Sequence, residues 1–297
     1  MLIIFFNLVY LKVMDTTKSS ILIVLVVLIY LVSVYFINTT FIGTNGILIF
    51  NLHNAKNINC QADTNELTFK RLISDEYADN LANRVMKLQK HWRKKNPVMY
   101  TLGIGSYSED DYHSKVLKSN ELLENNFQDL YKILLDYFTQ LYPDSQVKYR
   151  PDCGLPGFHI FICNKLFSYP ISSVHTDKQW RKIRHYPHED LDIENTFSFT
   201  LTVQLPKSGG GLYIFKDIKP SDSISKFIPN PILYNLAQKE KINYRKGHFV
   251  LHTGNTTHMI AHSNFSGEEK GDETQYRITL QCHGIYDKNN DIWWIYW

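Results

Sequence analysis

The sequence predicts a mainly β fold preceded by helices, and three observations support this prediction. Before Pro143, apolar residues recur at helical spacing in two long segments. After Pro143, short runs of β-branched and aromatic residues are bounded by Gly, Pro, Asn or Ser, which is typical of antiparallel strands. Within residues 197–205, apolar and polar side chains alternate, as in a strand with a buried outer face and a polar interior face. A barrel or jelly roll with a polar mouth fits this pattern.

Length and composition indicate one folded domain with an appendage. The chain has 297 residues, enough for a core domain of about 200 residues and a further segment. Hydrophobic residues make up 44% and aromatic residues 14%, which indicates a sizeable core. Charged residues make up 21% and the net charge is +3, so there is no strong nucleic-acid-binding signature. We therefore expect no nucleic-acid partner.

The most apolar segment lies near the N-terminus, where residues 21–37 contain no charged side chain. This length reaches the short end of a membrane-spanning helix. We therefore expect a transmembrane signal anchor at 21–42, preceded by a cytosolic tail at 1–20 that starts at Met1 or Met14. A cleaved signal peptide is the competing interpretation, although no clear small-x-small cleavage site follows the apolar run.

The charges around this segment predict its orientation. Lys12 and Lys18 precede it, whereas no Lys or Arg follows before Lys56. By the positive-inside rule, the chain is expected to be a single-pass membrane protein whose C-terminal domain is lumenal or extracellular. Three Asn-x-Ser/Thr sequences agree with that side of the membrane; they begin at Asn38, Asn255 and Asn264.

Residues 43–67 are rich in Asn and Thr and read as a stalk between the anchor and the folded domain. The chain has four cysteines and no Cys-x-x-Cys, so they do not form a zinc framework. Cys153 and Cys163 either form a disulfide between neighbouring extended segments or are reduced core residues.

A helical region is predicted at 68–145, packing on the β domain. Ser74, followed by two acidic residues, is a helix start, and apolar residues then recur at helical spacing up to Leu88. This helix is expected to end before Pro97, with the basic cluster 90–95 in its last turn, where cations suit the helix dipole. A second helix is predicted at about 120–142, with an apolar stripe on one face and Pro143 as its stop.

The β domain is predicted at 146–297. A Gly-rich run at 209–211 has no Gly-Lys-Ser/Thr ending and no helix directly after it, so it reads as a tight turn into a strand rather than a phosphate-binding loop. The predicted strands are 146–149, 158–163, 197–205, 211–215, 248–252, 258–262 and 276–282.

Two neighbouring side chains offer metal-ligand chemistry. His175 and Asp177 are two residues apart, so in an extended strand they share one face and could hold one ion together. Further along the chain, His258 follows the turn Thr253-Gly254-Asn255-Thr256-Thr257. Arg277 and Thr279 then repeat the two-residue spacing, offering a guanidinium and a hydroxyl on one strand face.

This ordered set of motifs resembles that of the iron(II)- and 2-oxoglutarate-dependent dioxygenases, in a prolyl-hydroxylase-like form: His-x-Asp, a distant His, then Arg-x-Ser/Thr. The resemblance covers about residues 149–284 and implies a double-stranded β-helix, or jelly-roll, core. It implies iron(II) as the metal, with 2-oxoglutarate and dioxygen as co-substrates. The implied reaction is hydroxylation of a C–H bond of an unknown substrate, with small molecules and protein side chains both as candidates.

By the same resemblance, the metal ligands are His175, Asp177 and His258. A triad of two histidines and one carboxylate leaves three positions of an octahedral iron(II) open, two for the oxo acid and one for dioxygen. The resemblance assigns Arg277 and Thr279 to the far carboxylate of 2-oxoglutarate, because a buried carboxylate needs a bidentate cation and a hydroxyl partner.

Several alternatives remain open at this point. His252 and His262 compete with His258 for the third ligand position, and His258 is preferred because it directly follows the turn. A cupin-like metal enzyme would use His175, His258 and His262 without an oxo acid. A non-catalytic, membrane-tethered β-barrel binding module would keep the fold without turnover. The other histidines, His159 and His283 among them, are expected to form local hydrogen bonds or to lie in solvent.

Overall fold

Two β-sheets and two α-helices make up the described part of the computed structural model, which comprises residues 67–106, 112–163, 172–207, 209–216, 237–262 and 275–297. The large sheet has the order β1-β9-β6-β11-β5-β3-β2, with β12 beside β11 and β4 beside β12, and the small sheet has the order β10-β7-β8. All strand pairs are antiparallel except β12 with β4. The predicted mainly β fold with helices before it is confirmed.

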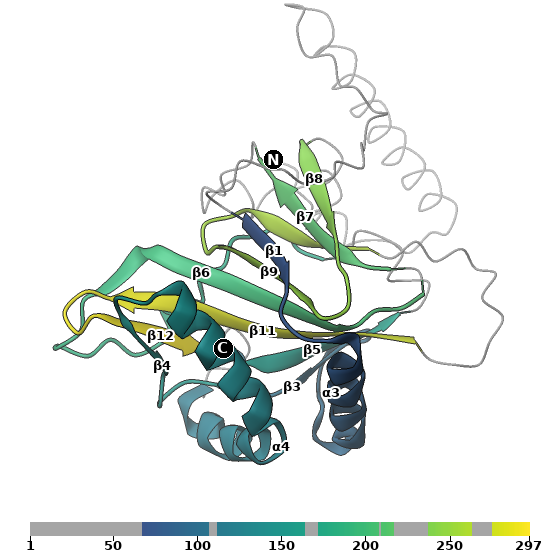
Figure 1. Cartoon of the computed structure of the whole chain (residues 1–297), viewed down its shortest axis with the longest axis horizontal. Coiled ribbons are helices and arrows are strands. Elements are labelled where there is room, and N and C mark those ends of the chain that lie inside the picture. Colours follow the sequence, from purple (N-terminus) through teal and green to yellow (C-terminus); the bar gives the residue numbers. More distant parts are fainter. Residues whose placement is uncertain (1–66, 107–111, 164–171, 208, 217–236, 263–274) are drawn as a thin grey trace, which may run out of the picture. The chain divides into compact units, whose positions relative to one another are not determined.

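Figure 1 shows helices α3 and α4 on one side of the large sheet and the strands β7 and β8 on the other. The helices are α3 (Asp75–Lys87) and α4 (Tyr112–Leu141), with short 3-10 turns η1 (Gln89–His91) and η3 (Gln179–Lys182). The strands are β1 (Leu67–Arg71), β2 (Arg93–Asn96), β3 (Met99–Leu102), β4 (Gln146–Tyr149), β5 (Gly157–Cys163), β6 (Leu191–Gln204), β7 (Gly211–Phe215), β8 (Lys239–Asn243), β9 (His248–Thr253), β10 (His258–Ala261), β11 (Gln275–Asp287) and β12 (Ile292–Tyr296).

Helix α3 begins at the residue that the sequence predicts. The Ser74 side chain accepts a hydrogen bond from the backbone N–H of Tyr77, which satisfies one of the free donors of the first turn. Asp75 and Glu76 then complement the positive end of the helix dipole. The helix buries one face toward the large sheet, at Ala78, Leu81, Ala82 and Val85.

The predicted continuation of this helix through the basic cluster is wrong. Helix α3 ends at Lys87, and after η1 the residues Arg93–Asn96 form strand β2, which pairs with β3 at an edge of the large sheet. The Trp92 indole N–H donates to the Val85 carbonyl and folds the chain back over the helix end. Basic side chains on an edge strand discourage unwanted pairing with other chains, so the cluster suits this place as well as a helix end.

Helix α4 carries the predicted apolar stripe and starts earlier than expected, at Tyr112. It bends at Phe127, whose φ of −139° is not helical, so two helical segments follow one another. The stripe is buried against the large sheet except at its last member, Leu141, which is 40% exposed. Phe138 lies at the centre, with its ring centroid 4.9 Å from that of Phe197 and 5.3 Å from that of Phe199.

The alternation in β6 separates the apolar core from the polar interior, as predicted. Phe197 and Phe199 pack toward α4, while Ser198, Thr200 and Thr202 are buried on the opposite face of the strand. That opposite face looks toward the small sheet, whose apolar side chains pack against those of β5 and β9. The two sheets therefore form a sandwich with a partly polar interior.

All seven predicted strands are present, with boundaries that differ by a few residues, and the Gly-rich run forms a turn before β7 in which Gly209 has φ +77°. The sequence missed β1, β2, β3, β8 and β12. Strands β2 and β8 are rich in lysine, and both lie at sheet edges, where polar side chains are tolerated. The predicted helical region 68–145 thus also contributes three strands to the large sheet.

Cys153 and Cys163 are both buried and free, so the prediction of reduced core residues is confirmed and the disulfide alternative is wrong. Burial raises the pKa of the Cys153 thiol to about 12 and that of Cys163 to about 11, which makes both poor nucleophiles. Of the predicted glycosylation sites, Asn38 and Asn264 lie outside the described residues.

The predicted membrane location is corrected by the structure. No helix among the described residues is both long and apolar enough to cross a membrane. Helix α4 has 30 residues, which is long enough for a span, but its exposed face carries charged side chains such as Glu121, Lys132 and Asp136. The predicted tail, anchor and stalk, 1–67, lie outside the described residues except for Leu67.

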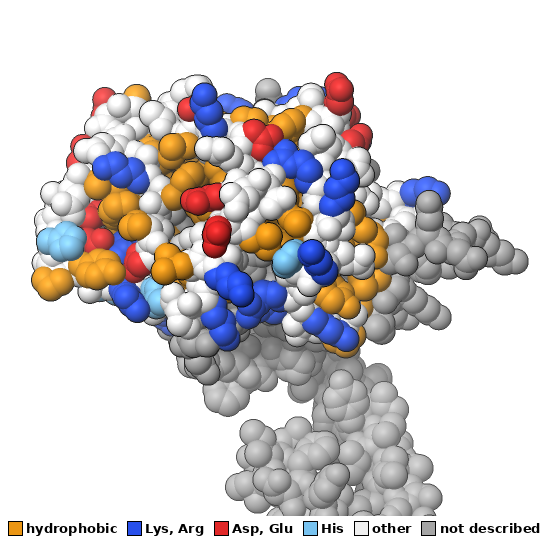
Figure 2. Space-filling view, turned by 90° about the horizontal axis from the view of Figure 1, so that it is seen from below, with side chains coloured by type: hydrophobic (Ala, Val, Ile, Leu, Met, Phe, Trp, Pro, Cys, Tyr) orange, Lys and Arg blue, Asp and Glu red, His pale blue; other side chains and the backbone are white. Residues whose placement is uncertain are grey.

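Charges of both signs are mixed over the surface that is seen from below the view of Figure 1. Figure 2 shows Lys, Arg, Asp, Glu and apolar side chains on this face, with some Lys and Arg side chains next to one another in its lower half. The expected lack of a nucleic-acid partner stays a prediction.

The packing of α4 on β6 predicts the cost of truncating its central side chain. Phe138→Ala should lower the free energy of unfolding by about 3–5 kcal/mol, because the side chain is fully buried between Phe197 and Phe199. Leu141→Ala, on the same helix but 40% exposed, is the control and should cost less than about 1 kcal/mol. Urea unfolding measures both, and equal losses for the two variants would contradict this packing.

Candidate metal centre

His175 and His258 are joined by their backbones. The His175 N–H donates to the His258 carbonyl at 3.0 Å, and the His258 N–H donates to the His175 carbonyl at 2.8 Å, which forms an isolated antiparallel bridge. Residues paired in this way project their side chains to the same side. The two imidazole centroids are accordingly 4.5 Å apart. The bridge thus brings together two histidines that are distant in the sequence.

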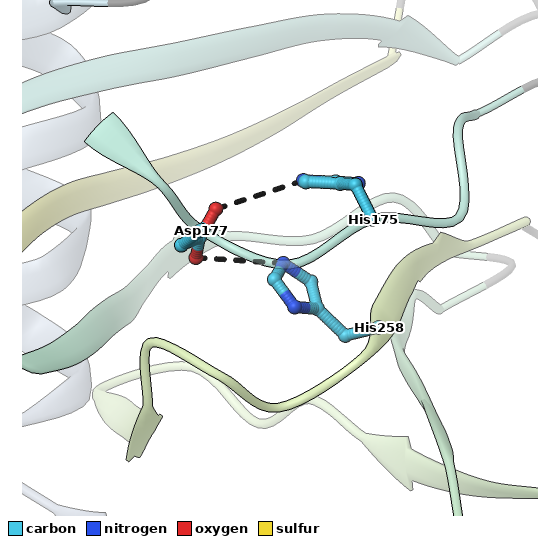
Figure 3. A group of neighbouring side chains, drawn as sticks. All are labelled: His175, Asp177 and His258. Carbon is cyan, nitrogen blue, oxygen red and sulfur yellow. Dashed lines mark ion pairs between the residues drawn. The ribbon is translucent and has the colours of Figure 1, made fainter. Parts of the chain in front are cut away.

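Asp177 completes a group of three possible metal ligands. Its backbone N–H donates to the Gly254 carbonyl at 2.9 Å, which ties the segment after His175 to the turn before His258. Its carboxylate oxygens lie 3.7 Å from His175 Nε2 and 3.6 Å from His258 Nε2, and one ligand atom from each residue lies within 4.8 Å of the others. Figure 3 shows the three side chains pointing toward one another. Neighbouring ligands at about 2.1 Å from an octahedral ion would lie about 3 Å apart, so the three ligand atoms would have to move closer together to hold one ion.

Hydrogen bonds on the far side of each imidazole fix which nitrogen faces the centre. His258 Nδ1 lies 2.9 Å from the Thr256 carbonyl, and His175 Nδ1 lies 3.0 Å from the Ser173 carbonyl. A carbonyl only accepts, so in each ring Nδ1 carries the proton and Nε2 has the free lone pair. This is the tautomer that a metal ligand requires, with the second nitrogen held by a backbone oxygen.

The electrostatics of the group suit a divalent cation. Burial lowers the pKa of His258 to about 3, so this imidazole is neutral at physiological pH. Burial also acts to raise the pKa of the Asp177 carboxyl, but the surrounding imidazoles, led by His258 and His283, outweigh it and hold the pKa well below its usual range. An imidazole that ligates a metal is neutral, so two imidazoles and one carboxylate would leave a bound divalent ion with net positive charge.

The two competing histidines, His252 and His262, are not in the group of possible metal ligands. His262 has its ring beside Tyr213, with the centroids 5.7 Å apart, and it is not in the group around Asp177. His252 is nearer, with its ring centroid 4.7 Å from that of His258, and its Nδ1 is 2.8 Å from the Thr253 carbonyl. The preference for His258 over both therefore agrees with the geometry.

Three polar residues near Asp177 were not assigned to the site by the sequence analysis. Gln179 Nε2 donates to Asp177 Oδ1 at 3.0 Å, and Ser198 Oγ donates to Asp177 Oδ2 at 2.5 Å. His283 lies beside them, with Nδ1 4.0 Å from Asp177 Oδ2. The alternation that predicts the polar face of β6 already marks Ser198, whereas His283 becomes visible only once β11 is paired with β6.

Arg277 and Thr279 lie on the same face of β11 as His283 and are buried inside the sandwich. Arg277 is 1% exposed, and its guanidinium lies over the ring of Tyr244 at 4.9 Å and over that of Phe161 at 5.6 Å. Its Nη2 donates to the Gly211 carbonyl at 3.3 Å.

Within the described part of the chain, this guanidinium is incompletely satisfied. Arg277 Nε and Nη1 have no hydrogen-bond partner there, and neither does the hydroxyl of Thr279. Burial lowers the pKa of Arg277, yet a guanidinium keeps its proton in proteins. A buried cation without an anion is costly, so a carboxylate-bearing ligand at this place would relieve the cost. The arrangement thus fits the group that the resemblance implies.

The fold and site can be compared with known proteins. No protein-family model matches the sequence, and no curated protein matches it at a significant level. Among solved structures, the chain is similar to an N-substituted L-amino acid dioxygenase from Burkholderia ambifaria AMMD in complex with alpha-KG, with 12% identity, a TM-score of 0.48 and coverage of 78% of this chain and 86% of that one.

The chain is also similar to the non-heme alpha ketoglutarate dependent epimerase SnoN from nogalamycin biosynthesis, with 10% identity and a TM-score of 0.42. The match covers 74% of this chain and 80% of that one. A third similar structure is that of a prolyl-4-hydroxylase from Pseudomonas putida, with 10% identity and a TM-score of 0.33. The match covers 73% of this chain and 91% of that one. A likeness at these TM-scores assigns neither activity nor substrate, so the function of this chain rests on its own site residues.

A buried histidine near Arg277 predicts how stability changes with pH. His159 lies opposite Thr279 in the β5–β11 pairing, and burial, followed by the charge of Arg277, lowers its pKa to about 3. Because the folded pKa is below the usual value of about 6.5, protons bind the unfolded chain first, and stability is lost as pH falls from about 6.5 toward 3. His159→Gln should reduce this loss by about 1.4 kcal/mol per pH unit.

The measurement is urea unfolding at several pH values between 6 and 4. His185→Gln, at an exposed position, is the control and should leave the pH dependence as in the wild type. If His159→Gln and the wild type lose stability at the same rate, His159 is not held neutral in the folded chain.

Proposed function

We propose that this chain is an iron(II)- and 2-oxoglutarate-dependent oxygenase that hydroxylates a C–H bond of an unknown substrate. The observation that carries the proposal is the pairing of a His-Asp-His group with a buried arginine that lacks an anionic partner among the described residues. A metal site alone would fit many enzymes, and a buried arginine alone would fit many binding proteins. Together inside one β-sandwich they favour a metal enzyme that uses a carboxylate co-substrate.

His175, Asp177 and His258 would hold the iron. Three protein ligands leave three positions of an octahedral ion for other groups, and a fourth would block either the oxo acid or dioxygen. Bound iron(II), together with 2-oxoglutarate and dioxygen, would supply the oxidising power for hydroxylation. The chain itself orients the ligands through the carbonyls of Ser173 and Thr256.

Arg277 and Thr279 would hold the far carboxylate of 2-oxoglutarate. The free N–H groups of Arg277 suit a bidentate contact with a carboxylate, and the Thr279 hydroxyl can donate a further hydrogen bond. Tyr244 and Phe161 flank the guanidinium and keep water from it. His159 is neutral because of burial, so it adds no positive charge beside Arg277.

The arrangement of the sheets supports a double-stranded β-helix as the finer description of the fold. The small sheet β10-β7-β8 faces the large one, and the metal ligands lie where the His175–His258 bridge extends the small sheet. The His175 side chain is 39% exposed, whereas Asp177 and His258 are each 8% exposed. We infer that the substrate approaches from the His175 side, and a protein side chain is one candidate for it.

The test of this function is the binding of 2-oxoglutarate to the full chain loaded with iron(II) under anaerobic conditions. Arg277→Gln should weaken that binding by at least about 100-fold, because removing one partner of a buried ion pair costs about 3–5 kcal/mol. The affinity of Arg277→Lys for 2-oxoglutarate should lie between those of the wild type and Arg277→Gln, because lysine keeps the charge but loses the bidentate contact. Isothermal titration calorimetry measures each variant.

Two controls separate the outcomes. Arg245→Gln removes an exposed arginine next to Tyr244 and should bind 2-oxoglutarate as the wild type does. The iron(II) affinity of Arg277→Gln should stay within about 3-fold of the wild type, because Arg277 is not in the ligand group. Oxygen consumption that needs no 2-oxoglutarate and ignores Arg277→Gln would support the cupin-like alternative instead. A chain that binds neither iron nor 2-oxoglutarate would support a non-catalytic module.

A further inference from the structure

The Asp177 carboxylate receives a hydrogen bond on each oxygen from within the protein. Gln179 donates to Oδ1, and Ser198 donates to Oδ2 at 2.5 Å, which is at the short end for a hydroxyl bound to a carboxylate. Gln179 is a neighbour in sequence, but Ser198 comes from the middle of β6, in the large sheet. Ser198 is 3% exposed, so its hydroxyl bonds within the protein interior. This bond links the ligand segment to the large sheet.

The Ser198 hydroxyl has a second partner on the adjacent strand. His283 of β11 lies directly opposite Ser198 in the antiparallel pairing, and its Nδ1 is 3.1 Å from Ser198 Oγ. The His283 side chain is 7% exposed. Its Nε2 is buried and has no hydrogen-bond partner among the described residues. Among the described residues, the His283 ring therefore forms a hydrogen bond only through Nδ1, with Ser198.

Counting protons fixes the direction of both bonds. The Ser198 hydroxyl has one proton, and an ionised carboxylate can only accept. At 2.5 Å from Asp177 Oδ2, the Ser198 oxygen must direct its proton at the carboxylate, since two facing lone pairs at that distance would repel. The Ser198 oxygen is then the acceptor toward His283, so His283 carries its proton on Nδ1. The order of donation runs from His283 to Ser198 to Asp177.

We propose that Ser198 and His283 act together as positioning residues for the metal ligand Asp177. His283 orients the Ser198 hydroxyl, and Ser198 holds one oxygen of the carboxylate, so that the carboxylate faces the two histidines before a metal arrives. The inference rests on the proposed function, because it concerns the same metal site. It adds that the affinity of the site for a metal depends on a donor at position 283, which is outside the ligand group.

The same geometry argues against a direct role of His283 in coordination. Its Nδ1 is engaged with Ser198, and the group of atoms close enough to share an ion includes His175, Asp177 and His258 but not His283. Outer hydrogen-bond partners of metal ligands typically contribute about 10- to 100-fold to metal affinity. That range is the effect expected here for losing either member of the pair.

The experiment measures the binding of cobalt(II) to the full chain by its visible absorption, which reports both affinity and ligand geometry. Ser198→Ala and His283→Phe should each raise the dissociation constant by about 10- to 100-fold. Two conservative variants are matched controls. Ser198→Thr keeps the hydroxyl, and His283→Asn keeps an N–H at the same number of bonds from the backbone as Nδ1, so both should stay within about 3-fold of the wild type.

The double variant decides whether the two residues act in series. If His283 acts through Ser198, then Ser198→Ala with His283→Phe should bind cobalt(II) no more weakly than Ser198→Ala alone, within about 3-fold. If the two residues had only separate structural roles, the double variant would lose cobalt(II) affinity by the product of the two single losses. His283→Asn would then also bind cobalt(II) as weakly as His283→Phe. Either result overturns the inference. If His283→Phe does not fold, Ser198→Ala and His283→Asn still decide, because cobalt(II) binding by Ser198→Ala equal to that of the wild type, or a loss of binding in His283→Asn, overturns the inference as well.

The wild-type titration separates this inference from the function on which it rests. If the wild type binds no cobalt(II), the proposed metal site fails and the inference fails with it. If the wild type binds cobalt(II) and Ser198→Ala binds it equally well, the metal site stands and only the positioning role is wrong.

Discussion

The backbone bridge between His175 and His258 is the constraint on which the rest of the site depends. It consists of two hydrogen bonds, at 3.0 and 2.8 Å, between residues from distant parts of the chain. The bridge forms because β10 pairs with β7 in the small sheet and leaves its other edge at His258 open to the segment around His175. Asp177 follows two residues after His175 in extended backbone, so its side chain lies on the same side as that of His175. The Gly254 carbonyl accepts a hydrogen bond from the Asp177 backbone N–H. The backbone positions of the ligands therefore follow from main-chain pairing, while the side chains of Ser198 and His283 orient the Asp177 carboxylate.

The large sheet separates buried polar groups from the apolar core. Strands β6 and β11 send their aromatic and aliphatic side chains to the helices, and the same strands send Ser198, Thr202 and Thr279 to the interior of the sandwich. The polar interior is costly where a buried group has no hydrogen-bond partner among the described residues, as at Nε and Nη1 of Arg277. If a carboxylate ligand binds Arg277 as proposed, it should also raise the stability of the folded chain. Function and folding thus compete for the same buried groups.

The parts of this molecule that could be predicted from the sequence are those written in local patterns. The start of α3 at Ser74, the stripe of α4 and the alternation of β6 each depend on residues close together in the chain. The triad could be proposed because its members fall in a recognisable order, whereas Ser198 and His283 could not, because their contact depends on how β6 and β11 pair, including a register shift near Thr279. Strand β2 was taken for the end of a helix because its lysines suit either place, and only its pairing with β3 decides. The membrane location, based on a single apolar segment, found no support.

The central claim is that His175, Asp177 and His258 hold iron(II) with two adjacent positions open to an oxo acid. The most direct measurement is an anaerobic titration of the full chain with iron(II), followed by 2-oxoglutarate, while the visible absorption spectrum is recorded. If the claim holds, a single iron binds, and adding 2-oxoglutarate produces a weak visible charge-transfer band that Asp177→Ala abolishes. Iron binding without any such band, or an equal band in Asp177→Ala, would contradict the claim.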